Sequence, residues 1–183
     1  MASAITHFIV GASLALPAIE SVSVRGVMPR WAILVSSGLL AVAPDLDTLA
    51  MRALDIPYGS FFGHRGFFHS PFFLILFSLL VARRHAWIAL MWAGCAVTHP
   101  LLDALTDGGS GVMLLFPFST ERLFFPWTPI HVSPLGILEF FDRAGYILRS
   151  EVPFCAAAVA IGVAGLLAMR RPWRGARPSP LGE

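Results

Sequence analysis

The chain has 183 residues, of which 56% are hydrophobic and 13% are charged, and its formal net charge of +2 comes entirely from arginine because lysine is absent. A soluble domain is usually about a quarter charged and about half apolar, so this composition excludes an ordinary water-facing exterior and predicts an integral membrane protein. Such a small charge excess gives no reason to expect a nucleic-acid partner, and the lipid bilayer is the expected partner.

Five apolar segments follow one another along the chain. They cover residues 5–19, 31–43, 71–82, 86–102 and 152–169. A helix perpendicular to the bilayer needs about 20 residues to span it, with about 17 as the lower limit, so the last two segments alone qualify without polar flanking residues. The predicted fold class is all-α, a polytopic membrane helix bundle with about four to five spans.

Proline and serine mark where some of these segments begin or end. Pro44 is expected to end or bend the second segment. Ser70 followed by Pro71 predicts a helix start, with the serine as N-cap and the proline at the first helical position. His99 and Asp103 are four residues apart and are expected to share one helical face, unless the proline between them kinks the helix.

The long connection between the fourth and fifth segments, residues 103–151, is rich in glycine, proline and phenylalanine. It predicts an ordered interfacial loop, with an amphipathic helix over residues 136–150 lying on the membrane surface. We interpret residues 1–170 as a single membrane-embedded domain and the arginine- and proline-rich residues 171–183 as a disordered basic tail. The positive-inside rule favours a cytoplasmic tail and an outer N-terminus, because eight of the thirteen arginines then lie inside.

Histidines and aspartates gather at particular ends of the apolar segments. They lie near the start of the first segment, at the end of the second, before the third and at the end of the fourth. In an up-and-down bundle these four positions share one membrane face, whichever way the bundle is oriented. The sequence therefore predicts that one site collects His7, Asp45, Asp47, His64, His69, His99 and Asp103.

The residue types in this set are typical of a metal site. Imidazole and carboxylate without thiolate suit Zn²⁺ first, with Mn²⁺ or Fe²⁺ as alternatives, and the two cysteines, Cys95 and Cys155, are expected to be core thiols. Seven candidate ligands exceed one tetrahedral site, so we expect one to three metal ions, or acids that serve as base or outer ligands. Metal-bound water loses a proton near neutral pH, and Asp47 or Asp103 is the candidate general base.

Other polar residues near the set are open to two interpretations. Arg65 either clamps an anionic substrate such as a phosphate, as a catalytic residue, or anchors a positively charged face. His131 in the long loop belongs either to the site or to the loop structure. Thr106 and Asp107 are expected to orient a ligand from behind, whereas His85, at the opposite face, is expected to be structural.

At these residues the sequence resembles the bacterial and archaeal YdjM-like (LexA-regulated) family of inner-membrane metal-dependent hydrolases. The resemblance covers roughly residues 4–150. It implies a membrane-bound hydrolase in the inner (cytoplasmic) membrane, and a looser likeness to all-helical zinc phospholipases C slightly favours phosphoesters. The pieces that carry it are Thr6-His7 with Gly11, Pro44-Asp45-Leu46-Asp47, His64-Arg65-Gly66, His69-Ser70, His99-Pro100-Leu101-Leu102-Asp103, Thr106 with Gly109, and residues 114–117 and 124–134.

We therefore expect a multi-pass, metal-dependent hydrolase that acts on a phosphoester or phospholipid-type substrate at the outer (periplasmic) membrane interface. The alternative is a non-catalytic metal-binding membrane protein, a transporter or a sensor, whose ligands would continue across the bilayer. An intramembrane metalloprotease ranks last, because none of these histidines begins an HExxH motif.

Overall fold

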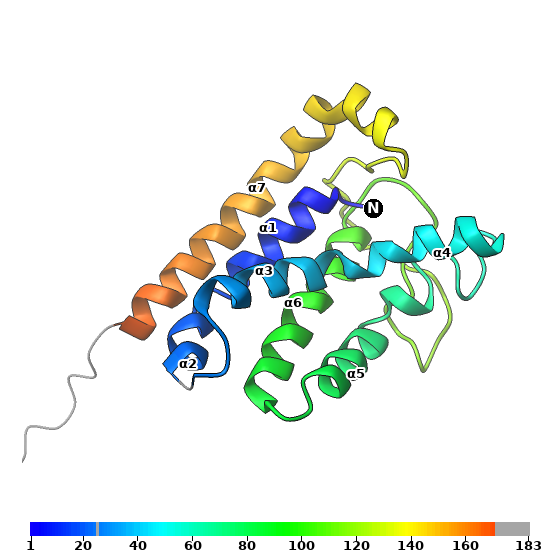
Figure 1. The fold of residues 1–183 in the computed structure, drawn as a ribbon. Coiled ribbons are helices and arrows are strands. Elements are labelled where there is room, and N and C mark those ends of the chain that lie inside the picture. The colour runs from blue at the N-terminus through cyan, green and yellow to red at the C-terminus, as the bar shows by residue number, and fades with distance from the viewer. Residues whose placement is uncertain (25, 171–183) are drawn as a thin grey trace, which may run out of the picture.

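The structure, a computed structural model, describes residues 1–24 and 26–170 and is all-α (Figure 1). The long loop between the last two helices carries isolated β-bridges. The expected tail, residues 171–183, lies outside the described residues. The elements in chain order are α1 (Ala4–Leu14), α2 (Ala18–Val24), α3 (Arg30–Val42), the 3₁₀ turn η1 (Ala43–Leu46), α4 (Asp47–Leu54), the 3₁₀ turn η2 (Phe67–His69), α5 (Pro71–Val81), α6 (Ala86–Ala104) and α7 (Ile137–Arg170).

Two stretches within residues 1–24 and 26–170 are long and apolar enough, by length and composition, to cross a membrane. One is Arg30–Leu54, which comprises α3, η1 and α4, and the other is α7. The helices α1 and α5 are apolar but shorter. The all-α class is thus confirmed, while the expected number of spans stays a prediction.

The first apolar segment forms two helices. α1 ends at Leu14 and α2 begins at Ala18, with Pro17 between them. Proline lacks a backbone N–H and its ring clashes with the preceding turn of a helix. The apolar run of the sequence continues across this break, because the hydropathy of Pro17 does not reveal that its backbone lacks a hydrogen-bond donor.

Pro44 bends the second segment but does not end it. α3 passes into η1, with Pro44 in its first turn, and α4 then continues to Leu54. The 3₁₀ turn winds more tightly than an α-helix, with about three residues per turn. Asp45 and Asp47, which lie at this turn, are both buried on the inside of the bundle.

The next two helices follow the sequence-based expectation. Ser70 caps α5, its Oγ accepting a hydrogen bond from Phe73 N at 3.2 Å. α6 runs through Pro100 to Ala104. His99 and Asp103 therefore remain on one helical face, with His99 Nε2 and Asp103 Oδ2 3.8 Å apart.

The largest difference from expectation is α7. The sequence predicts a surface helix over residues 136–150 and a separate span over residues 152–169, but one helix of 34 residues covers both. At 1.5 Å per residue it is about 50 Å long, well beyond the hydrocarbon core of about 30 Å. The polar pair Ser150 and Glu151 resembles a boundary in the sequence. It fits inside the helix because Ser150 Oγ donates to a carbonyl one turn earlier and Glu151 is buried against the start of α1.

The helices pack so that the ends bearing histidine and aspartate meet. α1 packs against α3, α6 and α7, and both α3 and α5 pack against α6. The contact of α1 with α3 is close at Gly11, where an added Cβ would lie 2.5 Å from Ala41 Cβ. The start of α1, the turns η1 and η2, and the end of α6 thereby come together at one side of the bundle (Figure 1).

Candidate metal centre

The structure brings the seven candidate ligands of the sequence together in the interior. The four histidines of the set and Asp103 are fully buried, and Asp45 and Asp47 are 9% and 7% exposed. Two overlapping groups within this cluster have nitrogen and oxygen atoms close enough to hold a metal ion. No strand or continuous loop supplies them. They come from four places in the chain, namely the start of α1, the turn from η1 into α4, the segment that ends in η2, and the end of α6, as the alternation of segment ends predicts.

The first group consists of Asp45, His69, His99 and Asp103, whose candidate ligand atoms all lie within 4.8 Å of one another. Asp45 Oδ1 is 3.6 Å from His69 Nε2 and 3.4 Å from His99 Nε2. The carboxylate of Asp103 completes the group from the last turn of α6. Two imidazoles and two carboxylates form a donor set that suits Zn²⁺, Mn²⁺ or Fe²⁺.

The second group consists of Asp47, His64 and His69. Asp47 Oδ1 lies 2.9 Å from His64 Nδ1, and Asp47 Oδ2 lies 3.2 Å from His69 Nδ1. His69 thus presents one ring nitrogen to each group. Asp47 can orient both imidazoles from behind one metal ion, or this group can hold an ion of its own.

A hydrogen bond sets the orientation of His99. Its Nδ1 lies 2.7 Å from the carbonyl oxygen of Ala41. Because a carbonyl can only accept, Nδ1 carries a proton, which leaves Nε2, on the side of Asp45 and Asp103, as the ring nitrogen available to a metal ion. His7 stacks on His99 with ring centroids 3.7 Å apart, and its Nε2 is 3.3 Å from Asp103 Oδ1. His7 therefore borders the first group.

The cluster holds most of the unpartnered polar atoms of the described chain. Twelve buried side-chain nitrogen and oxygen atoms in residues 1–24 and 26–170 have no hydrogen-bond partner, and ten of them belong to the seven candidate ligands. Seven of the ten face an oppositely charged or imidazole partner at 3.2–3.8 Å in ion-pair contacts, and the other three are His7 Nδ1, Asp45 Oδ2 and His64 Nε2. An unsatisfied buried polar atom costs about 1–3 kcal/mol, so a cluster held by such loose contacts is better explained by a bound ion than by packing. Metal ligands need free lone pairs, and these residues therefore fit a divalent cation.

The two histidines around Asp47 respond differently to their surroundings. Burial disfavours the charged form of both rings. At His69 the carboxylates of Asp45 and Asp47 outweigh burial and raise the pKa to about 9. At His64 burial, together with the neighbouring His69, outweighs Asp47 and lowers the pKa below its ordinary value. His69 therefore carries a proton between two carboxylates, at a position that a divalent cation can take.

Arg65 lies behind Asp103 and ties the long loop to the cluster. It is fully buried and adopts a left-handed backbone conformation with φ of 62°. Its Nη1 donates to Gly108 O at 2.8 Å and its Nη2 donates to Thr106 Oγ1 at 2.7 Å. Its Nε lies 3.2 Å from Asp103 Oδ2. These contacts orient Asp103, and the expected role of Arg65 as a substrate clamp stays a prediction.

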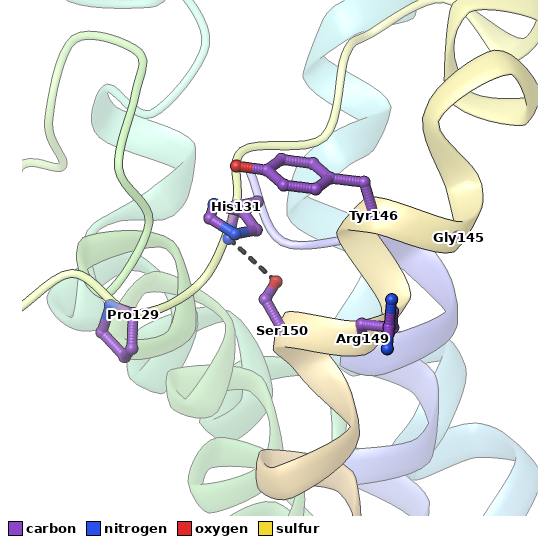
Figure 2. Close-up of a pocket in the computed structure, with 6 residues that line it drawn as sticks. All are labelled: Pro129, His131, Gly145, Tyr146, Arg149 and Ser150. Carbon is purple, nitrogen blue, oxygen red and sulfur yellow. Dashed lines mark hydrogen bonds between the residues drawn. The ribbon is translucent and has the colours of Figure 1, made fainter.

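His131 pairs with Asp107 at a distance from the cluster. Its Nδ1 lies 2.8 Å from Asp107 Oδ2, and its ring stacks on Tyr146 with centroids 3.9 Å apart. None of the seven clustered residues lines the adjoining cavity, which is therefore separate from the candidate metal centre. This cavity has a volume of about 640 Å³ and is lined by Pro129, His131, Gly145, Tyr146, Arg149 and Ser150 (Figure 2).

Two polar residues that the sequence analysis does not single out support the cluster. Glu151 in α7 accepts hydrogen bonds from Ser3 N, Ser3 Oγ and Thr6 Oγ1, which fixes the start of α1 just before its histidine. Arg122 Nη1 donates to His64 O at 2.7 Å. An acid next to a long apolar run is a signal that marks Glu151, whereas no local pattern distinguishes Arg122 from an ordinary loop arginine.

Comparisons with known proteins agree with the resemblance seen in the sequence. The family model of the YdjM inner membrane protein matches residues 1–174. The chain is 33% identical over 182 residues to the inner membrane protein YbcI of Escherichia coli (strain K12), a match that covers 94% of this chain and 98% of that protein. No solved structure matches the chain.

Proposed function

Because the chain belongs to the YdjM inner membrane protein family, we propose that its buried histidine–aspartate cluster makes it a metal-dependent hydrolase. The observation that supports this proposal is the set of ten unpartnered nitrogen and oxygen atoms on seven clustered residues. Zn²⁺ is the first choice of metal, with Mn²⁺ or Fe²⁺ as alternatives. The proposed substrate is a phosphoester or phospholipid-type molecule.

The residues divide into ligands and neighbours that position them. Asp45, His69, His99 and Asp103 would hold the ion, with His7 and His64 as further ligands. The ion would act as a Lewis acid and activate water near neutral pH. Hydrolysis adds water across the phosphoester bond, with its oxygen going to phosphorus and its proton to the leaving oxygen.

Asp47 is the better candidate for the base that accepts the proton of the attacking water. Both carboxylates are buried, with the side chain of Asp47 2% exposed, but Asp103 already accepts a hydrogen bond from Ala2 N at 2.7 Å. Asp103 also contacts the Arg65 guanidinium, a permanent positive charge that weakens a carboxylate as a base, whereas Asp47 contacts the two imidazoles of His64 and His69. This assignment predicts a larger loss of turnover than of metal content when Asp47 becomes asparagine.

We further propose that the protein is a multi-pass bundle of about four to five spans with the cluster at the periplasmic interface. The distribution of arginines supports this orientation, since most of them lie in the connections and tail assigned to the cytoplasm. Short apolar helices such as α1 and α5 suit a cluster placed in the headgroup layer, where polar helix ends are solvated.

A metal transporter or sensor is the alternative function. It requires metal ligands along a route across the bilayer, and in the part of the chain that the structure describes both groups of candidate ligands lie at one side of the bundle. Uptake of radioactive Zn²⁺ into proteoliposomes distinguishes a transporter from a hydrolase, because a hydrolase moves no net metal.

The experiment that tests the proposal is elemental analysis of detergent-purified protein beside His64→Ala, His99→Ala and His85→Ala variants. We expect stoichiometric Zn²⁺, Mn²⁺ or Fe²⁺ in the wild type, loss in the first two variants and retention in His85→Ala, because His85 is exposed at the other end of α6. Turnover of bis(p-nitrophenyl) phosphate should follow metal content. A wild type that neither contains nor takes up metal refutes the proposal.

A further inference from the structure

The candidate metal centre has one side from which a substrate can approach. Its four histidines and Asp103 are fully buried, and the two acids of the η1–α4 turn, Asp45 and Asp47, alone among the seven retain some exposure. The long loop closes the opposite side, where Arg65 contacts both Thr106 and Asp103. A substrate therefore reaches the cluster past the η1–α4 turn.

An apolar groove leads to this turn. α3 and α5 both pack against α6, while few contacts join α3 and α5 directly, and the two helices diverge from the region of the cluster (Figure 1). A cavity of about 310 Å³ lies between them at the cluster end. Asp47 and Pro44 line it together with Phe68, Phe73 and Leu74.

A second cavity continues the groove away from the cluster. It has a volume of about 520 Å³, reaches Val81 and Trp92, and shares Leu40, Ala43, Leu46 and Phe77 with the first. From Phe73 to Val81 the groove follows α5 for roughly 12 Å, given a rise of 1.5 Å per residue. Asp47 is the one charged residue that lines either cavity within the described residues, and it lies at the cluster end.

The surroundings of the groove favour a hydrocarbon chain as its occupant. Large apolar side chains are exposed on the elements that border it, among them Leu39 and Leu46, which line the groove, and Leu76 and Leu80 on α5 beside it. In an inner membrane protein these faces lie against lipid. An apolar groove that opens to lipid and ends at the candidate metal centre fits an amphiphile, with its chain in the groove and its polar group at that centre.

We propose that the substrate is a bilayer lipid phosphoester that approaches sideways from the membrane. Its acyl chain lies between α3 and α5, and its phosphate reaches the cluster beside Asp45 and Asp47. The position of the phosphate rests on the proposed hydrolase function, whereas occupation of the groove by an acyl chain does not. The groove then determines specificity, because a soluble phosphoester gains nothing from it.

The test fills the groove without changing a ligand. Ala43→Phe places a phenyl ring where the two cavities meet, and Ala160→Phe, at an exposed alanine of α7, is the matched control. Retention of dipalmitoyl phosphatidylglycerol by the detergent-solubilised protein is measured by native mass spectrometry, with metal content determined in parallel. We expect Ala43→Phe to lose about tenfold or more in retention, since two displaced methylenes suffice for that factor, and Ala160→Phe to behave as wild type.

The outcomes separate this inference from the proposed function. If Ala43→Phe keeps its metal and retains the lipid as wild type does, the groove is not the chain site and the inference is overturned. If the wild type lacks metal but the groove variant alone loses lipid, the hydrolase fails while the chain site stands. Turnover adds a second measure, because Ala43→Phe should lose hydrolysis of the lipid and keep hydrolysis of bis(p-nitrophenyl) phosphate. Leu40→Trp, one helical turn earlier, replaces Ala43→Phe should that variant lose its metal.

Discussion

Replacing Glu151 in α7 with alanine should destabilise the protein strongly. Its carboxylate is fully buried and accepts three hydrogen bonds from the first residues of the chain, through Ser3 N, Ser3 Oγ and Thr6 Oγ1. The hydroxyls of Ser3 and Thr6 are already 3.4 Å apart and can pair with each other after the change. The backbone N–H of Ser3 has no such alternative and remains unsatisfied.

The magnitude follows from these contacts. An orphaned buried N–H costs about 1–3 kcal/mol, and the loss of two further hydrogen bonds costs about 1 kcal/mol each. Glu151→Ala should therefore lower the stability by about 3–5 kcal/mol, which for a chain of this size corresponds to about 6–20 °C in Tm. Thermal unfolding in detergent measures it, with Asp142→Ala, an exposed acid of the same helix, as the control. A loss below about 1 kcal/mol would show that Glu151 does not hold α1.

Three further predictions concern pH and packing. The pKa of His69 is raised to about 9, so below that pH the ring must lose its proton when metal binds. Metal affinity should therefore rise with pH between about 7 and 9. Competition with a chelator measures the affinity, and a pH-independent value would contradict the role of His69 as a ligand. The pKa of Asp107 is lowered, because the hydrogen bond to His131 outweighs burial, which acts in the opposite direction. The pair therefore stabilises the fold above the ordinary pKa of aspartate, and this stabilisation is lost as the pH falls through the lowered pKa. Asp107→Asn should thus cost up to about 1 kcal/mol at pH 7 and nothing at about pH 2, as followed by chemical denaturation at both pH values. Gly11→Ala would place its Cβ 2.5 Å from an alanine Cβ of α3 and should lower the stability by about 1–3 kcal/mol. Gly94→Ala is the control, because the space around Gly94 is open, and it should be neutral or stabilising. Equal Tm values for both variants would contradict the close packing of α1 on α3.

The clustering of the seven residues could be predicted from the sequence because it follows from the order of the helices along the chain. Alternate ends of consecutive helices lie at one side of a bundle, so the positions of His7, Asp45, His69 and His99 along the chain suffice to bring them together. Ser70 before Pro71 likewise determines a helix start through local chemistry alone. Neither inference needs knowledge of tertiary contacts.

What the sequence could not show depends on contacts between distant residues. Glu151 resembles the boundary of a span until the start of α1 supplies its hydrogen-bond donors, and α7 is consequently one helix where two were expected. Asp107 lies close in sequence to Asp103, yet it turns to His131 because the long loop returns to that position. Such pairings depend on the path of the loop, which produces no periodic pattern in the sequence.

The contacts also determine which variant reports on metal binding with the smaller loss of stability. Asp103 accepts a hydrogen bond from Ala2 N and contacts Arg65 as well as His99, so its removal disturbs the start of the chain and the long loop together with the metal. The side chain of His64 has Asp47 as its hydrogen-bond partner, and its other ring nitrogen is unpartnered. Both variants should lower metal content, but His64→Ala orphans one carboxylate oxygen of Asp47 and should cost the metal-free protein less stability than Asp103→Ala, which removes the contacts to Ala2, Arg65 and His99. Comparing the two variants with and without a chelator separates the contribution of Asp103 to the fold from its contribution to the site.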